Sequence, residues 1–310
     1  MFLISRSLSL LFYLSHFCAA NIETIWLSDA WDGDNNITCH NPSSCSIHCS
    51  TELACGASPS SLHRPYIQCP QTADCQNCSI HCMDTDSCSN SIIMTGSCRN
   101  VEINIESGTN RQMIIHAPSN AGNLQINVLS TDRDAAFDDN EIRSHDTNDI
   151  IVHCNGHSSC QRNQIHAESV QRTLNITCTN HSECDQQEIH CPDNNDLTLH
   201  PQCHIDCRSD ASCYDMSIFA MNGTKGTRNG VKIHCDDSDD LICDDSRIYC
   251  SDDRVCNLRF HRMQNAWFCH GECGDDVDFD TNSADISSTQ STVSAGFADT
   301  NTSSFEHSTP

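Results

Sequence analysis

The 310-residue chain carries 42 Asp and Glu against 16 Lys and Arg, which gives a formal net charge of −26 at pH 7. This balance disfavours nucleic acid and anionic membrane surfaces as partners, because both would add negative charge. Only 5% of the residues are aromatic, whereas 25 are cysteine. The composition therefore argues against a large conventional core and for disulfides formed in an oxidising compartment.

Residues 1–20 have the pattern of a secretory signal peptide. Arg6 precedes an apolar run from Leu8 to Phe17, and Cys18-Ala19-Ala20 supplies small residues at the cleavage site. The alternative, a membrane anchor, is disfavoured because the run is short for a span. Removal of Cys18 with the signal leaves 25 − 1 = 24 cysteines. We predict a secreted or cell-surface-associated protein with no transmembrane segment once the signal is removed.

A repeated cysteine unit follows a predicted N-terminal cap at residues 21–36. The segment 36–49 (NITCHNPSSCSIHC) recurs at 175–191 (NITCTNHSECDQQEIHC), with looser copies at 66–82, 151–167 and 232–250. In each Ile-x-Cys, the Ile and the Cys share one face of a strand. The Asn, Ser, Asp and Pro residues between cysteines favour turns. The unit therefore predicts short strands alternating with turns, and no segment shows a sustained helical stripe.

The same spacing, Cys followed after five residues by Cys, occurs eight times in the repeats. A bridge can close each spacing internally, or join equivalent cysteines on stacked coils about 4.8 Å apart, so the partners remain open. The predicted disulfide cysteines are Cys39, Cys45, Cys49, Cys55, Cys69, Cys75, Cys82, Cys88, Cys154, Cys160, Cys178, Cys184, Cys207, Cys213, Cys250 and Cys256.

The repeats predict an all-β fold, a parallel β-helix at residues 37–273. Related strands start 24 to 30 residues apart (Cys154 to Cys178, Cys39 to Cys69), which suits one coil and leaves room for roughly eight coils. The strand rhythm continues between Arg99 and His153 without cysteine, which disfavours the alternative of small independent disulfide modules. The interior residues predicted there are Ile103, Ile105, Ile114, Ile126, Val128, Ile150 and Val152.

Residues 274–310 are rich in Ser, Thr, Asp and Asn, and they predict a disordered tail. Acidic pairs precede it at 236–237, 239–240, 244–245 and 252–253, and the run 275–280 follows. Carboxylates in turns can bind Ca²⁺, but the spacings of the known calcium loops are absent. A solvated acidic face is the favoured interpretation.

Histidine recurs at the middle position of the strand motif. If Ile and Cys point inward, these imidazoles lie on the outer face and can stack on successive coils. Such a column predicts a Zn²⁺ or Cu²⁺ site, although histidine also tolerates exposed strand positions without binding metal. The candidate ligands are His48, His81, His153, His190 and His234, with His166 in a copy that lacks the cysteine.

Six Asn-x-Ser/Thr sequons agree with secretion. Each one marks a candidate N-glycan on an exposed surface. The acceptor residues are Asn36, Asn77, Asn175, Asn180, Asn222 and Asn301.

Over residues 37–260, the repeat of Ile-x-Cys and paired cysteines resembles the cysteine-rich, right-handed parallel β-helix proteins of protist surfaces, which share the pectin-lyase-like superfold. The resemblance implies an extracellular structural, adhesive or ligand-binding module with a protein or carbohydrate partner. Polysaccharide-cleaving enzymes of that superfold are the catalytic alternative. Their motifs are not matched, since Gly156-His157 is followed by Ser and the only lysines are Lys225 and Lys232.

Overall fold

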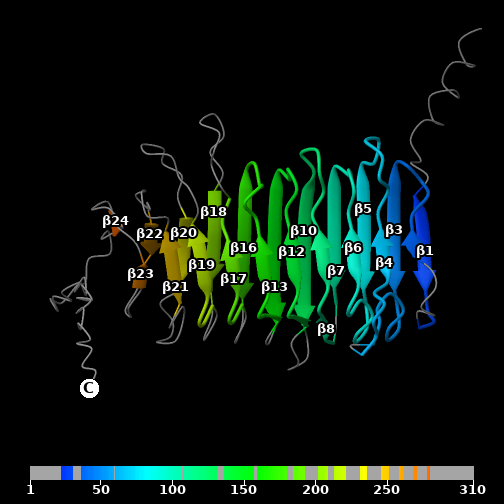
Figure 1. Ribbon diagram of the computed structural model, residues 1–310, viewed down its shortest axis with the longest axis horizontal. Helices are drawn as coiled ribbons and strands as arrows, with labels where there is room; N and C mark the ends of the chain where they lie inside the picture. The colour runs from blue at the N-terminus through cyan, green and yellow to red at the C-terminus, as the bar shows by residue number, and fades with distance from the viewer. Residues whose placement is uncertain are drawn as a thin grey trace, which may run out of the picture. The chain divides into compact units, whose positions relative to one another are not determined.

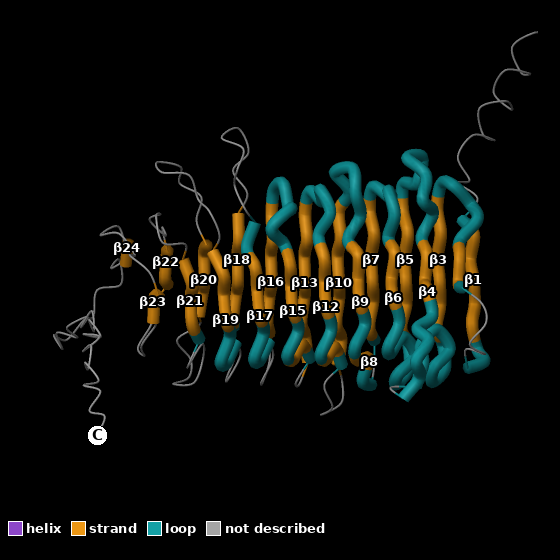
Figure 2. Tube along the Cα trace, viewed as in Figure 1, coloured by secondary structure: helices purple, strands orange, loops and turns teal. Residues whose placement is uncertain are grey.

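The computed structural model is a parallel β-solenoid in which successive coils stack edge to edge (Figure 1). It describes residues 22–30, 36–58, 60–106, 108–130, 136–156, 159–179, 184–192, 202–208 and 213–220, and then strand segments at 231–235, 246–250, 258–261, 268–270 and 278–279. Strands alternate with loops, and no helix occurs among these residues (Figure 2). The predicted all-β solenoid is confirmed.

Each coil contributes one strand to each of two long sheets. The first sheet contains β1 (Glu23–Leu27), β3 (Ser44–Cys49), β5 (Asn77–Cys82), β7 (Asn100–Ile105), β10 (Asn123–Ser130), β13 (Asp149–Gly156), β16 (Thr173–Thr179), β18 (Gln202–Cys207), β20 (Val231–Cys235), β22 (Leu258–His261) and β24 (Asp278–Phe279). The second contains β2 (Ile37–Thr38), β4 (Tyr66–Gln68), β6 (Ile92–Met94), β9 (Ile114–His116), β12 (Glu141–Arg143), β15 (Gln164–His166), β17 (Glu188–His190), β19 (Ser217–Ala220), β21 (Arg247–Cys250) and β23 (Phe268–His270). A third, short sheet contains β8 (Asn110–Arg111), β11 (Phe137–Asp138) and β14 (Cys160–Gln161).

The strands pair in register, so equivalent side chains stack into columns along the solenoid. The central interior column is entirely β-branched and is buried throughout; it consists of Ile47, Ile80, Ile103, Ile126, Val152, Ile176, Ile205 and Ile233. Branched side chains suit this position because they pack well on a pleated surface. The predicted inward direction of Ile and Cys in Ile-x-Cys is confirmed.

One corner of the coil is built the same way in six successive coils. The residue two positions before each second-sheet strand has a φ between 50° and 56°; these residues are Asn90, Gln112, Asp139, Arg162, Gln186 and Asp215. The left-handed conformation turns the chain sharply, at a cost for non-glycine residues. The next residue points inward, and the six residues so placed are Ser91, Met113, Asn140, Asn163, Gln187 and Met216. The buried Ser246, directly before β21, continues this column.

The polar members of this corner column offset that cost with hydrogen bonds between coils. The Asn140 side chain donates to the carbonyl of Asn110 at 3.2 Å and accepts from the Met113 N–H at 2.8 Å. Asn163 donates in the same way to the carbonyl of Phe137. A buried amide is costly when it is unpaired, so the hydrogen bonds of Asn140 and Asn163 favour this corner geometry.

The described residues contain nine disulfides, and six of them close a Cys-x5-Cys spacing internally. These six are Cys39–Cys45, Cys49–Cys55, Cys82–Cys88, Cys154–Cys160, Cys178–Cys184 and Cys207–Cys213. They lie at two different corners of the coil. Cys39–Cys45 joins the end of a second-sheet strand to the next first-sheet strand, whereas Cys49–Cys55 begins at the end of a first-sheet strand. For Cys250 and Cys256 the pairing lies outside the described residues.

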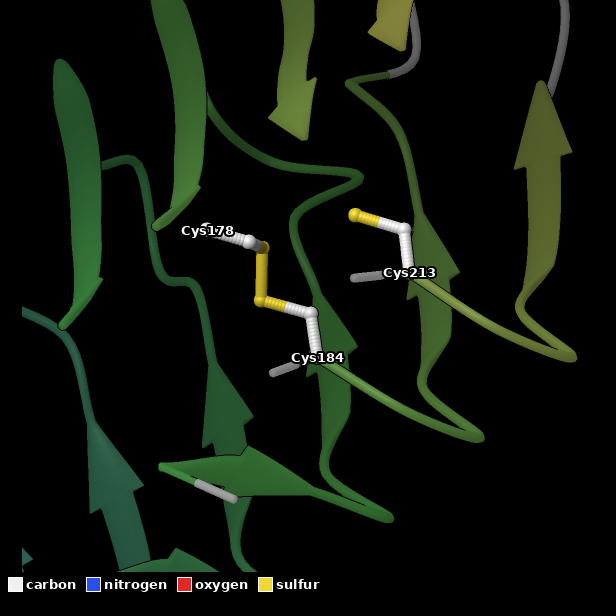
Figure 3. A group of neighbouring side chains, drawn as sticks. All are labelled: Cys178, Cys184 and Cys213. Carbon is white, nitrogen blue, oxygen red and sulfur yellow. A yellow bond between two sulfur atoms is a disulfide. The ribbon is translucent and has the colours of Figure 1, made fainter. Parts of the chain in front are cut away.

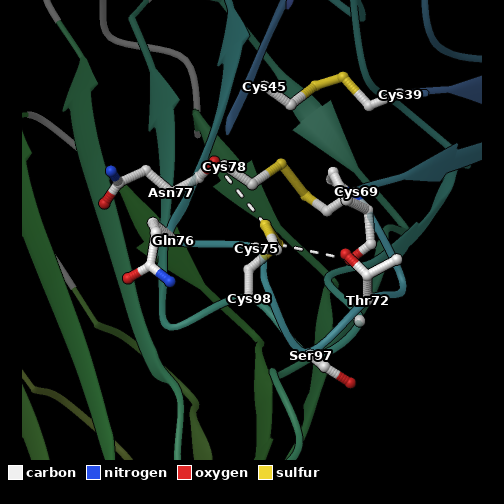
Figure 4. Close-up of a disulfide and its surroundings, with 12 residues drawn as sticks. Cys39, Cys45, Cys69, Thr72, Cys75, Gln76, Asn77, Cys78, Ser97 and Cys98 are labelled. Atoms are coloured by element: carbon white, nitrogen blue, oxygen red, sulfur yellow. Dashed lines mark hydrogen bonds between the residues drawn. A yellow bond between two sulfur atoms is a disulfide. The ribbon is translucent and has the colours of Figure 1, made fainter. Parts of the chain in front are cut away.

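The spacing Cys69–Cys75 is not closed internally. Cys69 pairs with Cys78, at the corner that Cys39–Cys45 occupies one coil earlier, because the intervening turn is three residues longer (separation 9 instead of 6). Cys75 then pairs with Cys98 on the next coil, with Cα atoms 4.5 Å apart (Figure 4). This separation is close to one strand spacing, so Cys75–Cys98 joins equivalent positions of neighbouring coils.

At one corner of the coil, some coils have a disulfide where other coils have a small residue and a larger aliphatic residue. Cys39, Cys69 and Cys191 occupy positions that hold Thr95, Ala117, Ser144 and Ala167 in the intervening coils. Their partners Cys45, Cys78 and Cys203 are in register with Val101, Leu124, Ile150 and Leu174. A small residue facing a larger aliphatic residue therefore fills the volume of a disulfide, and the solenoid continues where cysteine is absent.

Two sequence predictions need adjustment. Ile114 points outward and is only half-buried, whereas Met113 and Ile115 are buried. Because two isoleucines are adjacent, the sequence does not show which of them points inward. The left-handed conformation of Gln112 determines that Met113 and Ile115 do. Strands also extend beyond the predicted limits, since β1 lies within residues 21–36 and β24 after residue 273.

The equivalent positions in neighbouring coils predict which side chains can replace the Cys191–Cys203 disulfide. Cys191→Ala with Cys203→Leu reproduces the Ala167 and Leu174 pair of the preceding coil, whereas Cys191→Ala with Cys203→Ala leaves a cavity. Both variants lack the disulfide, so their difference isolates packing. We expect the leucine variant to be the more stable by about 2 kcal/mol in urea denaturation.

Leu129→Ala is the control, because Leu129 is 46% exposed and its truncation should change stability by about 0.5 kcal/mol or less. Equal stability of the two cysteine double variants would contradict the packing account.

Candidate functional site

The outer faces of the two long sheets carry the histidines. In the first sheet, the column that follows the motif histidines consists of Trp26, His48, His81, Asn104, Asn127, His153, Thr177 and Asp206, with His234 next in register. In the second sheet, the outer column consists of Thr38, Gln68, Met94, His116, Arg143, His166, His190, Phe219 and Tyr249.

The predicted single histidine column is therefore wrong, because its members are divided between two sheets. His48 and His81 are neighbours, but two asparagines separate His81 from His153. His190 lies on the second sheet, beside His166. The motif Ile-x-Cys occurs on strands of both sheets, and sequence spacing alone does not distinguish them.

His48 and His81 form a stack that continues to Trp26. The ring centroids are 4.0 Å apart for Trp26 and His48 and 4.5 Å for His48 and His81. His48 Nε2 is 2.9 Å from the Ser46 hydroxyl, and His81 Nδ1 is 3.6 Å from Glu106 Oε1. Burial and the neighbouring His81 lower the pKa of His48, which favours the neutral form of the His48 ring.

A second group, the His–Glu cluster, consists of His166, Glu168, Glu188 and His190 on the outer face of the second sheet. Glu168 Oε1 is 3.3 Å from His190 Nδ1 and 3.6 Å from His166 Nδ1. The potential ligand atoms of His166, Glu168 and His190 all lie within 4.8 Å of one another. Glu188 Oε1 is 2.8 Å from His190 Nε2.

Neighbouring strands hold this cluster in place. The His190 ring stacks on Phe219 with centroids 4.6 Å apart, and Phe219 stacks in turn on Tyr249. On the other side, Glu141 Oε1 is 3.6 Å from His166 Nε2, and Arg143 holds the Glu141 carboxylate with two hydrogen bonds. These bonds lower the pKa of Glu141, which keeps a negative charge beside the imidazoles.

A third group of potential ligand atoms contains only cysteines. Cys178, Cys184 and Cys213 lie close together in the interior (Figure 3). Cys178 is bonded to Cys184, and Cys213 is bonded to Cys207. Because metals bind thiolates, these oxidised sulfurs do not form a metal site.

Other predicted sites are only partly described. Asn36 and Asn77 are exposed, as glycan acceptors require, whereas Asn175 is half-buried within β16. Asn180, Asn222 and Asn301 lie outside the described residues. The same holds for the acidic runs proposed for Ca²⁺, apart from Asp278 at the start of β24.

Sequence reasoning missed part of the second-sheet face. His116 and His145 form another close pair, with Nδ1 and Nε2 3.3 Å apart, although His145 lies in a turn outside the repeat motif. Glu168 and Glu188 were not predicted either. Of the residues missed, only Glu188 follows from strand alternation. It lies two residues before His190 in the same strand, so the two side chains point to the same face of the sheet.

No match to the chain is found among protein-family models, curated proteins or solved structures. In the described part of the chain, no helix has the length and hydropathy of a membrane span.

One carboxyl group away from these faces has a strongly shifted pKa. Burial raises the pKa of Asp185 from 3.8 to about 6, although it accepts a hydrogen bond from the Tyr214 backbone. One of its carboxylate oxygens is buried without a hydrogen-bond partner. The folded state thus binds the proton more tightly than the unfolded state, so the Asp185 contribution to stability is complete below pH about 4 and is lost as the pH rises through about 6.

Asp185→Asn replaces this carboxyl group by a neutral isostere. We expect it to raise the free energy of unfolding by about 1 to 2 kcal/mol at pH about 7.5, after allowance for partial solvent exposure, and to change it little at pH about 4. Urea denaturation at the two pH values measures this difference. The exposed Asp146→Asn is the control, and a gain for Asp185→Asn that is equal at both pH values would refute the assignment.

Proposed function

We propose that the chain is a secreted, disulfide-bonded β-solenoid that acts outside the cell as a structural, adhesive or ligand-binding module without catalysis. Nine disulfides among the described residues support an oxidising compartment, since thiols stay reduced in the cytosol. The signal-like residues 1–20 support the same location. A formal charge of −26 favours solubility and disfavours anionic partners.

The observation that carries the proposal is the regular polar surface of the first sheet. Side chains at the same position on neighbouring coils hydrogen-bond to one another along the stack. The Asn127 amide donates to Asn104 Oδ1 at 2.8 Å, and Ser79 donates to Ser46 Oγ at 2.9 Å. A surface that repeats every strand spacing, about 4.8 Å, suits an extended protein or carbohydrate ligand.

We further propose that the winding is right-handed and that the fold is related to the pectin-lyase-like superfold and to cysteine-rich protist surface proteins. Three parallel sheets wound by one chain and the polar corner ladder support this relation. Parallel strands joined by crossovers in one sheet are right-handed in nearly all proteins. The catalytic branch of that superfold is less favoured, because its motifs are not matched in the sequence.

Expression in a eukaryotic host tests the location. We expect the chain in the culture medium, beginning at Asn21 and carrying N-glycans at the exposed Asn36 and Asn77. N-terminal sequencing and mass spectrometry before and after enzymatic deglycosylation measure both. Asn36→Gln and Asn77→Gln are the matched controls for the glycans. Retention in the cell with residues 1–20 attached would contradict secretion.

The same purified material tests for catalysis. We expect no new reducing ends when it is incubated with polygalacturonate. Sustained release of oligosaccharides, abolished by substituting an acidic residue such as Glu102 on the first-sheet face, would show an enzyme instead.

A further inference from the structure

We propose that His166, Glu168 and His190 form a Zn²⁺ site on the outer face of the second sheet. The site does not depend on the function proposed above. It differs from the histidine column expected from the repeat, because its third ligand, Glu168, is a carboxylate that lies outside the repeat motif.

The distances between the ligand atoms fit the ion. Zn²⁺ binds imidazole nitrogen and carboxylate oxygen at about 2.0 to 2.2 Å in tetrahedral geometry, which places ligand atoms about 3.3 Å apart. Glu168 Oε1 is 3.3 Å from His190 Nδ1 and 3.6 Å from His166 Nδ1. Two of the three distances between ligand atoms are therefore close to the tetrahedral value. Small side-chain rotations can bring the third distance, between the two imidazole nitrogens, to the same value.

The hydrogen bond to Glu188 selects the tautomer of His190 that can bind metal. A carboxylate only accepts hydrogen bonds, so the proton of neutral His190 resides on Nε2, which is 2.8 Å from Glu188 Oε1. The lone pair on Nδ1 then faces Glu168. Metal-binding histidines commonly donate their other N–H to a carboxylate in this way, which orients the ring and increases its basicity.

His190 Nδ1 has no hydrogen-bond partner. The atom is buried without a hydrogen bond, and the His190 side chain is 15% exposed. Its approach to Glu168 does not satisfy hydrogen-bond geometry, so a proton between them is poorly placed. A lone pair and a carboxylate oxygen repel at this distance, and a cation bound to both removes that repulsion.

The surroundings favour zinc over calcium. Two imidazoles and one carboxylate suit Zn²⁺ and disfavour Ca²⁺, which takes oxygen ligands. The nearby Cys191 is bonded to Cys203 and offers no thiolate. Glu141 and Glu188 add negative charge around the imidazoles, while the Arg143 guanidinium is engaged by Glu141. By contrast, at the stack of His48 and His81 the carboxylate of Glu106 is 3.6 Å from His81, and Ser46 already contacts His48.

Isothermal titration of the full secreted chain with zinc chloride at pH about 7.5 tests the site. We expect one high-affinity Zn²⁺ per chain, and a loss of affinity of at least about tenfold in Glu168→Gln and in His190→Gln. His153→Gln is the matched control, because His153 lies on the first sheet, and its affinity should equal that of the parent. Calcium chloride should give no binding at this site.

Cobalt substitution provides a second readout that a folding defect does not imitate. Bound Co²⁺ should show the visible absorption of tetrahedral coordination, and Glu168→Gln should lose it while retaining the circular dichroism of the folded chain. Absence of zinc binding by the parent chain would overturn the proposal. Equal affinity in Glu168→Gln, His190→Gln and the parent would overturn it as well, and so would a loss confined to His153→Gln.

Discussion

The main-chain hydrogen bonds between successive coils are the constraint on which the rest of the structure depends. Each coil has too few apolar residues for a core of its own, and it buries them only because the neighbouring coil lies one strand spacing away. The register is strict, since Ile47, Ile80 and Ile103 follow one another in one interior column. The same register brings Cys75 to Cys98 and His166 to His190.

Disulfides strengthen this architecture without defining it. At one corner, Cys69 and Cys78 occupy the positions that Ala117 and Leu124 occupy two coils later. A disulfide restricts the unfolded chain, whereas an aliphatic pair contributes burial, and either fills the same volume. The cysteines of the nine described disulfides are buried in the interior, so the outer faces of the described strands present histidine, asparagine and glutamate as groups available for binding.

Much of the fold could be predicted from the sequence, because Ile-x-Cys has a period of two and recurs at the length of one coil. The predicted inward direction was wrong for Ile114. Ile114 and Ile115 are adjacent, so either could point inward, and the left-handed conformation of Gln112 determines that Ile115 does. The candidate site was harder to predict. His190 shares its motif with His48, but the two residues lie on different sheets, and Glu168 lies in a turn whose direction no periodicity specifies.

The disulfide pattern around Cys75 tests the stacked register most directly. Cys69–Cys75 has the same spacing as six internally closed pairs, so a chain of independent modules would close it too. Peptide mass spectrometry of the unreduced, digested protein distinguishes the two arrangements. Stacked coils predict a peptide that links Cys75 to Cys98 and another that links Cys69 to Cys78. A bond between Cys69 and Cys75 would contradict the account.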